Sequence, residues 1–282
     1  MTLRLGSRSS PLALAQARAV AAAIGATHRV ELVTSSDRPA GGARDKSRWV
    51  AGIEQALLDG EIDLAVHSAK DVPVEMPPGL AVIGAPERAD ARDALCGAPS
   101  LASLPAGARV GTSSLRRTAQ LRALRPDLEL CELHGNVDTR LRRLASGDFD
   151  AIVIAMAGLE RLGLAGGTPL DALVPAPGQG TLALEARAGD EAALAAIEAL
   201  RDAPAEAALA AERALVEALG AGCHTPLGAH ARRRDGALEL RAFVGRPDGS
   251  AWIVDELSGE DPEALGRGLA ARLLSAGAGE ML

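Results

Sequence analysis

Short apolar segments alternate with stretches of helical spacing through most of the chain, and this alternation constrains the fold more than any other feature. The first repeat runs from apolar residues 3–5 through a polar turn into a helix opened by Pro11, which the first helical position tolerates. A strand over 30–33, a helix over 49–58 and a buried strand over 63–66 continue the pattern. Such alternation predicts an α/β lobe, in which helices cover a sheet.

A second series of the same kind follows. Strands are predicted over 109–111, 128–131 and 151–155, with helices that begin at Leu115 and after Asn136. This series predicts a second α/β lobe.

The last third of the chain changes character. Residues 175–180, rich in Pro and Gly, are interpreted as a crossing between the lobes. An alanine-rich helical stretch over 190–219, with a break at Pro204, leads to hairpin strands over 238–244 and 252–257 and a helix from about residue 261. We therefore expect a first lobe of residues 1–88 and 180–200, a second lobe of residues 89–179, and a smaller C-terminal α+β domain of residues 203–282.

Composition excludes several classes of protein. Only four of the 282 residues are aromatic, which counts against proteins that stack nucleic-acid bases on aromatic rings. The net charge of −7 makes a poor general binder of phosphate backbones, so no nucleic-acid partner is expected. Because Gln16 and Arg18 interrupt the alanines near the start, no signal peptide or membrane span is predicted, and a cytoplasmic protein is expected.

The three cysteines differ in their surroundings. Cys96, Cys131 and Cys223 form no CxxC pair, so neither a disulfide framework nor a metal site is expected. Cys96 and Cys131 lie in apolar strands and are predicted to pack in the core. Cys223 follows a glycine-rich approach that leaves its thiol reachable. Direct pairing with His224 is not expected, because neighbouring side chains in extended backbone point to opposite faces.

Hydroxyl groups and cations gather at predicted helix starts. In residues 112–117, backbone N–H groups and hydroxyls at a helix start are followed by Arg116 and Arg117, a pattern typical of an anion site. The alternative is an ordinary serine cap with solvated arginines. Other helix starts carry similar groups, so a cleft at the carboxyl ends of the strands is expected to bind a ligand with several carboxylates or phosphates. These groups are Ser7, Arg8, Ser10, Asn136, Arg140, Arg142 and Arg143.

One carboxylate stands among these cations. Lys70 and Asp71 follow a buried strand, and the Val72-Pro73 pair is expected to hold Asp71 in extended backbone at the edge of the cleft. Asp71 could be a general acid or base, or a counter-charge for a developing cation. The alternative is a surface ion pair.

Six ordered motifs resemble those of hydroxymethylbilane synthase, also called porphobilinogen deaminase. The resemblance extends over nearly the whole chain. The motifs are residues 8–14 (RSSPLAL), 65–73 (AVHSAKDVP), 111–117 (GTSSLRR), 135–141 (GNVDTRL), 177–180 (PGQG) and the Gly-Cys pair at 222–223.

This resemblance implies a fold, a cofactor and a reaction. The family has two lobes like those of periplasmic binding proteins, with mixed sheets, and a smaller α+β domain that carries a cysteine. A dipyrromethane cofactor would be attached to Cys223 through a thioether. The family joins porphobilinogen units head to tail on this cofactor, releases ammonia at each step and frees a linear tetrapyrrole for haem synthesis. A cytoplasmic monomer without metal or membrane partner is expected.

By matching position, the resemblance also implies residue roles. Asp71 would stabilise positive charge on pyrrole nitrogens and assist proton transfer. The residues that would hold the cofactor are Ser68, Lys70, Thr112, Ser113, Ser114, Arg116, Arg117, Gly135, Asn136 and Arg140. Those that would contact the substrate are Arg8, Ser10, His134, Arg161 and Gln179.

The chain departs from the family pattern in two places. His134 stands where the family usually has Arg, so a cation that depends on pH replaces a fixed one. The segment of residues 36–48 is shortened; it retains Lys46, while Arg44 and Arg48 supply other charge and Trp49 takes the aromatic place. The alternatives to an active synthase are therefore a bilobal carboxylate-binding protein, which needs no reachable thiol, and a paralogue with weakened turnover. A phosphate-handling enzyme is disfavoured, since no P-loop sequence is present.

Overall fold

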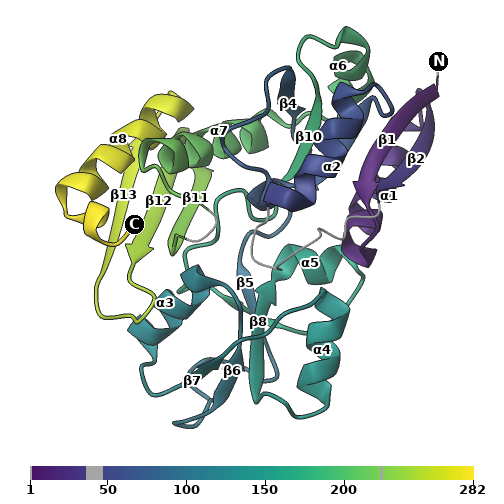
Figure 1. The fold of residues 1–282 in the computed structure, drawn as a ribbon. Coiled ribbons are helices and arrows are strands. Elements are labelled where there is room, and N and C mark those ends of the chain that lie inside the picture. The colour runs from purple at the N-terminus through teal and green to yellow at the C-terminus, as the bar shows by residue number, and fades with distance from the viewer. Residues whose placement is uncertain (1, 36–46, 223–224) are drawn as a thin grey trace. The chain divides into compact units, whose positions relative to one another are not determined.

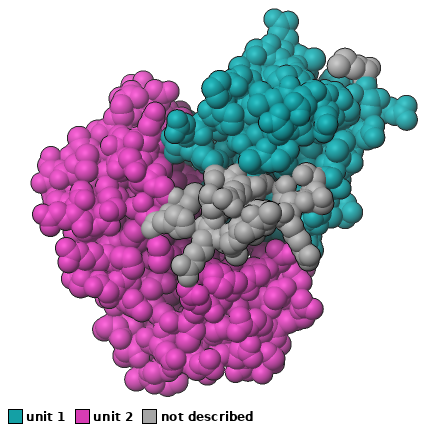
Figure 2. Space-filling model, in the orientation of Figure 1, with its two compact units in different colours: residues 1–89, 181–209 teal, residues 90–180, 210–282 magenta. Residues whose placement is uncertain are grey.

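The computed structural model describes residues 2–35, 47–222 and 225–282. These residues form two compact units, residues 1–89 with 181–209 and residues 90–180 with 210–282 (Figure 2). The chain passes from the second unit back to the first directly after Gly180, at the end of the Pro/Gly-rich segment predicted to be the crossing. Among the described residues, no helix has the length and apolar character needed to span a bilayer.

Unit 1 is an α/β lobe. Its elements are β1 (Thr2–Arg8), α1 (Pro11–Ile24), β2 (Arg29–Ser35), α2 (Ser47–Leu58), β3 (Leu64–Ser68), the 3-10 helix η1 (Ala69–Asp71), β4 (Leu80–Gly84), β10 (Leu182–Arg187), α6 (Glu191–Ile197) and the 3-10 helix η2 (Glu198–Leu200). The strand order is β2-β1-β3-β10-β4, with β1 parallel to β2 and β3, and β10 antiparallel to β3 and β4. Val20 of α1 and Ile197 of α6 pack on one face, and Ile53 and Leu57 of α2 pack on the other. The predicted mixed sheet covered by helices is confirmed.

Unit 2 contains a second five-stranded sheet. The elements around it are β5 (Asp93–Cys96), β6 (Arg109–Gly111), α3 (Leu115–Leu124), β7 (Glu129–Cys131), α4 (Val137–Ala145), β8 (Ala151–Ala155), α5 (Met156–Arg161) and β9 (Thr168–Leu170). The order is β7-β6-β8-β5-β9, with β6 parallel to β7 and β8, and β5 antiparallel to β8 and β9. Leu121 of α3 packs on one face, and Leu141 of α4 and Leu159 of α5 pack on the other. Because β5 runs against its neighbour β8, it begins at the edge where β6 and β8 end.

The rest of unit 2 is the predicted α+β domain. Its elements are β11 (Leu227–Arg234), β12 (Ala237–Gly245), β13 (Trp252–Gly259), α8 (Pro262–Ser275) and the 3-10 helix η3 (Ala278–Glu280). They follow α7 (Ala203–Ala218), whose residues up to Leu209 belong to unit 1. The three strands form an antiparallel sheet in sequence order, on which α8 packs (Figure 1). A Cβ atom at Gly266 of α8 would collide with the backbone of Ala211, so only glycine allows α7 and α8 to approach this closely.

The predicted break in the helical stretch 190–219 is confirmed and lies at residues 201–202, between η2 and α7. Pro204 itself lies in the first turn of α7, where no helical hydrogen bond needs its missing N–H. The side chain of Asp202 accepts a 2.7 Å hydrogen bond from the Ala205 N–H and so satisfies that turn. Cys96 lies in β5, in agreement with the strand expected around it, whereas β4, β9, β10 and β11 are additional to those predicted, because runs of three to eight residues carry little periodic signal.

Three titratable side chains are buried together in unit 1. His67 of β3 and Glu185 of β10 lie with Nε2 and Oε2 2.9 Å apart, and Glu54 of α2 is also buried. Burial and, after it, the negative charge of Glu185 raise the pKa of Glu54, whereas His67 lowers it by a smaller amount. Glu54 therefore holds its proton more tightly in the folded protein than in the unfolded chain.

Replacing Glu54 by Gln should raise the thermal midpoint at pH 7.5 and leave it nearly unchanged near pH 4. An acid whose pKa is raised by folding loses stability as the pH rises above its unfolded value, about 4.3, so ionised Glu54 costs stability at neutral pH and its amide does not. Thermal unfolding followed by circular dichroism at both pH values measures this, with the exposed Glu61→Gln as the control. A midpoint change of the same size at both pH values would contradict the expectation.

Candidate active site

In unit 1, predicted site residues lie at the carboxyl ends of neighbouring parallel strands. β1 ends at Arg8, and Ser10 caps α1 by accepting a 3.3 Å hydrogen bond from the Ala13 N–H. β3 ends at Ser68, whose Oγ accepts a 2.9 Å hydrogen bond from the Gln16 amide of α1. Because β1 and β3 pair in parallel, their ends meet at one edge of the sheet. The structure therefore brings Arg8, Ser10 and Ser68 to that edge.

Lys70 and Asp71 lie in η1, directly after β3, and both are half-buried. The expectation that Asp71 is in extended backbone is wrong, since it occupies the last position of a 3-10 turn. Extended backbone is found at Val72 instead, with φ −84° and ψ 123°, because proline restricts only the residue before it. The Ala69 N–H donates a 3.0 Å hydrogen bond to the carbonyl of Thr181, the residue before β10. The turn that presents Asp71 is thus tied to the neighbouring strand.

In unit 2, the hydroxyl-rich segment caps α3. Ser114 accepts a 3.4 Å hydrogen bond from the Arg117 N–H, and Oγ1 of the buried Thr112 accepts a 3.2 Å bond from the Ser114 N–H. Ser113 is exposed. Their predicted contacts with a ligand remain predictions.

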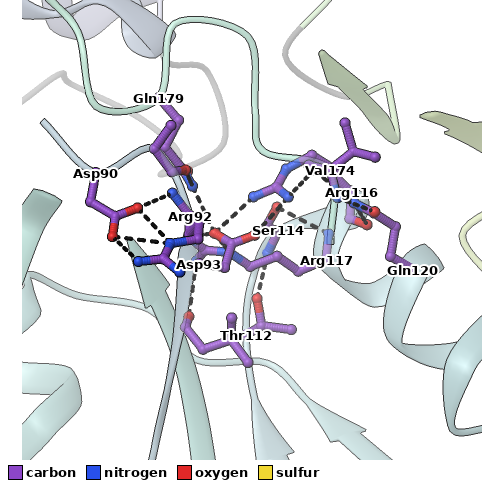
Figure 3. Close-up of polar contacts among 12 residues, drawn as sticks. Asp90, Arg92, Asp93, Thr112, Ser114, Arg116, Arg117, Gln120, Val174 and Gln179 are labelled. Atoms are coloured by element: carbon purple, nitrogen blue, oxygen red, sulfur yellow. Dashed lines mark hydrogen bonds and ion pairs between the residues drawn. The ribbon is translucent and has the colours of Figure 1, made fainter. Parts of the chain in front are cut away.

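The guanidinium groups of Arg116 and Arg117 point to a shared carboxylate, that of Asp93 at the start of β5 (Figure 3). From Arg116, Nη1 donates to Oδ2 at 2.7 Å and Nη2 to Oδ1 at 3.1 Å. From Arg117, Nε and Nη2 donate to Oδ1 at 2.9 and 2.7 Å. Asp93 is fully buried, and both arginines are nearly so, at 4% and 6% exposed. The alternative of an ordinary serine cap predicted arginines exposed to solvent, and the structure instead buries both of them.

Opposing effects set the ionisation of this cluster. Burial alone would raise the pKa of Asp93, but the two guanidinium groups hold it well below its usual range. Burial lowers the pKa of Arg117, and the charge of Asp93 works against that shift. The carboxylate is therefore ionised at all physiological pH values.

Sequence analysis did not identify Asp93. The available signal was an acidic residue directly before the apolar run 94–96. Its arginine partners depend on the direction of β5. Because β5 is antiparallel to β8, Asp93 lies at the edge of the sheet where β6 leads into α3.

Two further predicted residues bond to the chain near the crossing. The buried amide of Gln179 donates to Asp93 Oδ1 at 2.9 Å and to the Ala91 carbonyl at 2.7 Å. Arg161 at the end of α5 donates to the Gly180 carbonyl at 2.6 Å, and burial lowers its pKa.

The start of α4 carries the remaining predicted residues. Asn136 is the N-cap but makes no capping hydrogen bond with its side chain. Arg140 Nε donates a 2.7 Å hydrogen bond to the carbonyl of Gly135, whose φ of 108° requires glycine. The half-exposed ring of His134 has its Nε2 3.1 Å from Oε2 of Glu132, a neighbour that sequence analysis did not weigh. Whether His134 contacts substrate stays a prediction.

Several predictions concern residues outside the described ranges. These are Cys223 with His224, and the segment 36–46 with Arg44 and Lys46. Of the other cysteines, Cys96 is buried as predicted and Cys131 is partly exposed. Within the described residues, no group of three or more His, Cys, Asp or Glu side chains could hold a metal ion.

Comparisons with known proteins agree over the whole chain. The family model for the dipyromethane cofactor binding domain of porphobilinogen deaminase matches residues 3–195, and the model for its C-terminal domain matches residues 207–275. The chain is 48% identical to a porphobilinogen deaminase of Roseiflexus sp. (strain RS-1) and 45% identical to one of Thiobacillus denitrificans. Each alignment covers 100% of this chain and 98% of the relative.

Solved structures show a weaker likeness. A periplasmic substrate-binding protein of an ABC transporter from Coxiella burnetii is 18% identical, with a TM-score of 0.47, over 72% of this chain and 93% of the other. That score is too low to support a conclusion about function. The family models and the relatives, by contrast, extend over both lobes and the C-terminal domain. The chain belongs to the porphobilinogen deaminase family.

Proposed function

We propose that the chain is a hydroxymethylbilane synthase that condenses porphobilinogen head to tail, with release of ammonia, on a dipyrromethane attached to Cys223. It is a transferase of porphyrin, tetrapyrrole and haem biosynthesis, and its product is linear hydroxymethylbilane. The observation that carries this proposal is the match of the cofactor-binding domain across residues 3–195. We expect a cytoplasmic monomer that has no nucleic-acid or membrane partner.

The described residues fit such a cofactor. A dipyrromethane built from porphobilinogen bears several carboxylates, which need cations and hydrogen-bond donors. In unit 2, two guanidinium groups share a single carboxylate, and the buried Nε of Arg116 has no acceptor among the described residues. An unsatisfied buried donor beside surplus positive charge suits an anionic group. Arg116, Arg117 and Arg140 would hold it, and the resemblance to the family gives the same role to Ser68 and Lys70.

When bound, the dipyrromethane supplies the pyrrole to which the first substrate is joined. The chain's own residues bind and orient the substrate: Arg8, Ser10 and Arg161 hold its acetate and propionate groups. Loss of ammonia leaves positive charge on the substrate ring, and the Asp71 carboxylate stabilises that charge. The same carboxylate accepts or returns a proton at its oxygen atoms.

The rival function, passive binding of a carboxylated ligand, gives a different result with porphobilinogen. The synthase should release ammonia and form a linear tetrapyrrole, whereas a binding protein should hold porphobilinogen without consuming it. Ammonia release and tetrapyrrole absorbance, followed together in the purified protein, separate the two. Stoichiometric binding without ammonia would refute the proposed function.

A further inference from the structure

The Asp93 carboxylate is the common acceptor for three buried side chains. It accepts four hydrogen bonds from Arg116 and Arg117 of α3 and a fifth from Gln179 of the crossing segment. The same guanidinium groups also donate to main chain, Arg116 to the Val174 carbonyl at 2.6 Å and Arg117 to that of Val153 at 2.9 Å. Each arginine is therefore held at both ends of its planar fork, which leaves it little freedom to rotate.

The charges of this cluster do not balance. Among the described residues, the ion pairs of both guanidinium groups go to Asp93 alone, so two positive charges face one negative charge. The nearby Asp90 does not correct this, because its carboxylate binds Arg92 at 2.7 Å (Figure 3). Surplus charge in a buried place is costly unless another ion compensates it. The cluster therefore carries surplus positive charge that a further anion could compensate.

We propose that Asp93 is a positioning residue that holds Arg116 and Arg117 ready for a carboxylate of the dipyrromethane. A single protein carboxylate suits this role. Without it, the two guanidinium groups would repel each other in a buried place. With a second one, the pair would be neutralised and no positive charge would remain for the ligand. Gln179 acts in the same assembly by fixing Oδ1 of Asp93. The inference rests on the proposed function, since it assigns the anion to that cofactor.

Loading of the cofactor tests this without an activity assay. Wild type, Asp93→Asn and Asp93→Glu are purified from a host that makes porphobilinogen, and intact mass and thermal midpoint are measured for each. Asp63→Asn is the matched control, because Asp63 is also a buried aspartate bonded to an arginine, Arg4. Asp63 lies before β3, whereas the predicted site residues of unit 1 lie at the carboxyl end of that strand. Asp93→Asn should reduce the loaded fraction at least about tenfold, while Asp63→Asn loads fully with a lowered midpoint.

If Asp93→Asn does not fold, Asp93→Glu tests whether Asp93 positions the two arginines. It keeps the charge and displaces the carboxylate, so a folded protein with a reduced loaded fraction supports positioning. Full loading of Asp93→Glu, or an Asp93→Asn protein that folds and loads like Asp63→Asn, would overturn the inference. A wild type that carries no added mass would instead refute the proposed function, so the two failures are distinguishable.

Discussion

Asp71→Asn should lower the turnover of porphobilinogen at least roughly 100-fold while leaving fold and cofactor loading intact. The amide keeps the shape of the side chain but has no charge with which to stabilise a cationic ring and no acidic proton to exchange. Asp71 closes the short turn η1, which a main-chain hydrogen bond ties to Thr181, so the exchange should leave the backbone in place. Steady-state kinetics of protein whose loading is verified by intact mass measures the effect.

The matched control for this exchange is Asp59→Asn, an exposed aspartate at the end of α2 that bonds to Gln55. It should turn over like the wild type. If fully loaded Asp71→Asn also keeps near-wild-type turnover, Asp71 has only a structural role, and the proposed mechanism loses its central group.

Cys223→Ala should abolish both the covalent cofactor and the turnover. The thioether requires the sulfur, and no other group in this chain occupies the family's position of attachment. Protein from a porphobilinogen-producing host should be heavier than its sequence mass, and the alanine variant should lack the excess. Intact-protein mass spectrometry under denaturing conditions measures this, because only a covalent addition survives.

Cys131→Ala provides the control, since that thiol is partly exposed in β7 and should be irrelevant to attachment. Its mass excess and turnover should equal those of the wild type. A Cys223→Ala protein that keeps the excess would place the cofactor on another residue.

Local patterns predicted the elements that contain their own signals. Ser10 and Pro11 mark the start of α1, and Ser114 marks the start of α3, because a cap acts on backbone within three residues of itself. The same holds for the β12–β13 hairpin, whose turn lies between two runs of strand character. Six ordered motifs also predicted the family that the comparisons show.

The contacts that sequence analysis missed join distant segments. Asp93 lies 23 and 24 residues from its arginines and 86 from Gln179, and nothing in the local pattern of β5 gives its direction. Likewise, the sequence pattern predicted that Arg116 and Arg117 bind a ligand anion. A pattern of residue types does not show which protein carboxylate the fold brings beside them. A strand's direction and neighbours depend on the whole sheet.

The position of β10 in the sheet of unit 1 has a consequence for the order in which the chain can fold. β10 lies between β3 and β4, yet it is made only after the whole sheet of unit 2, which is built from residues 93–170. Until Leu182–Arg187 leave the ribosome, β3 and β4 lack their shared partner. Pairing of β10 with β4 then closes a loop of roughly 100 residues. The first lobe to be synthesised is therefore the second to be completed, and β3 and β4 present strand edges that lack their partner until then.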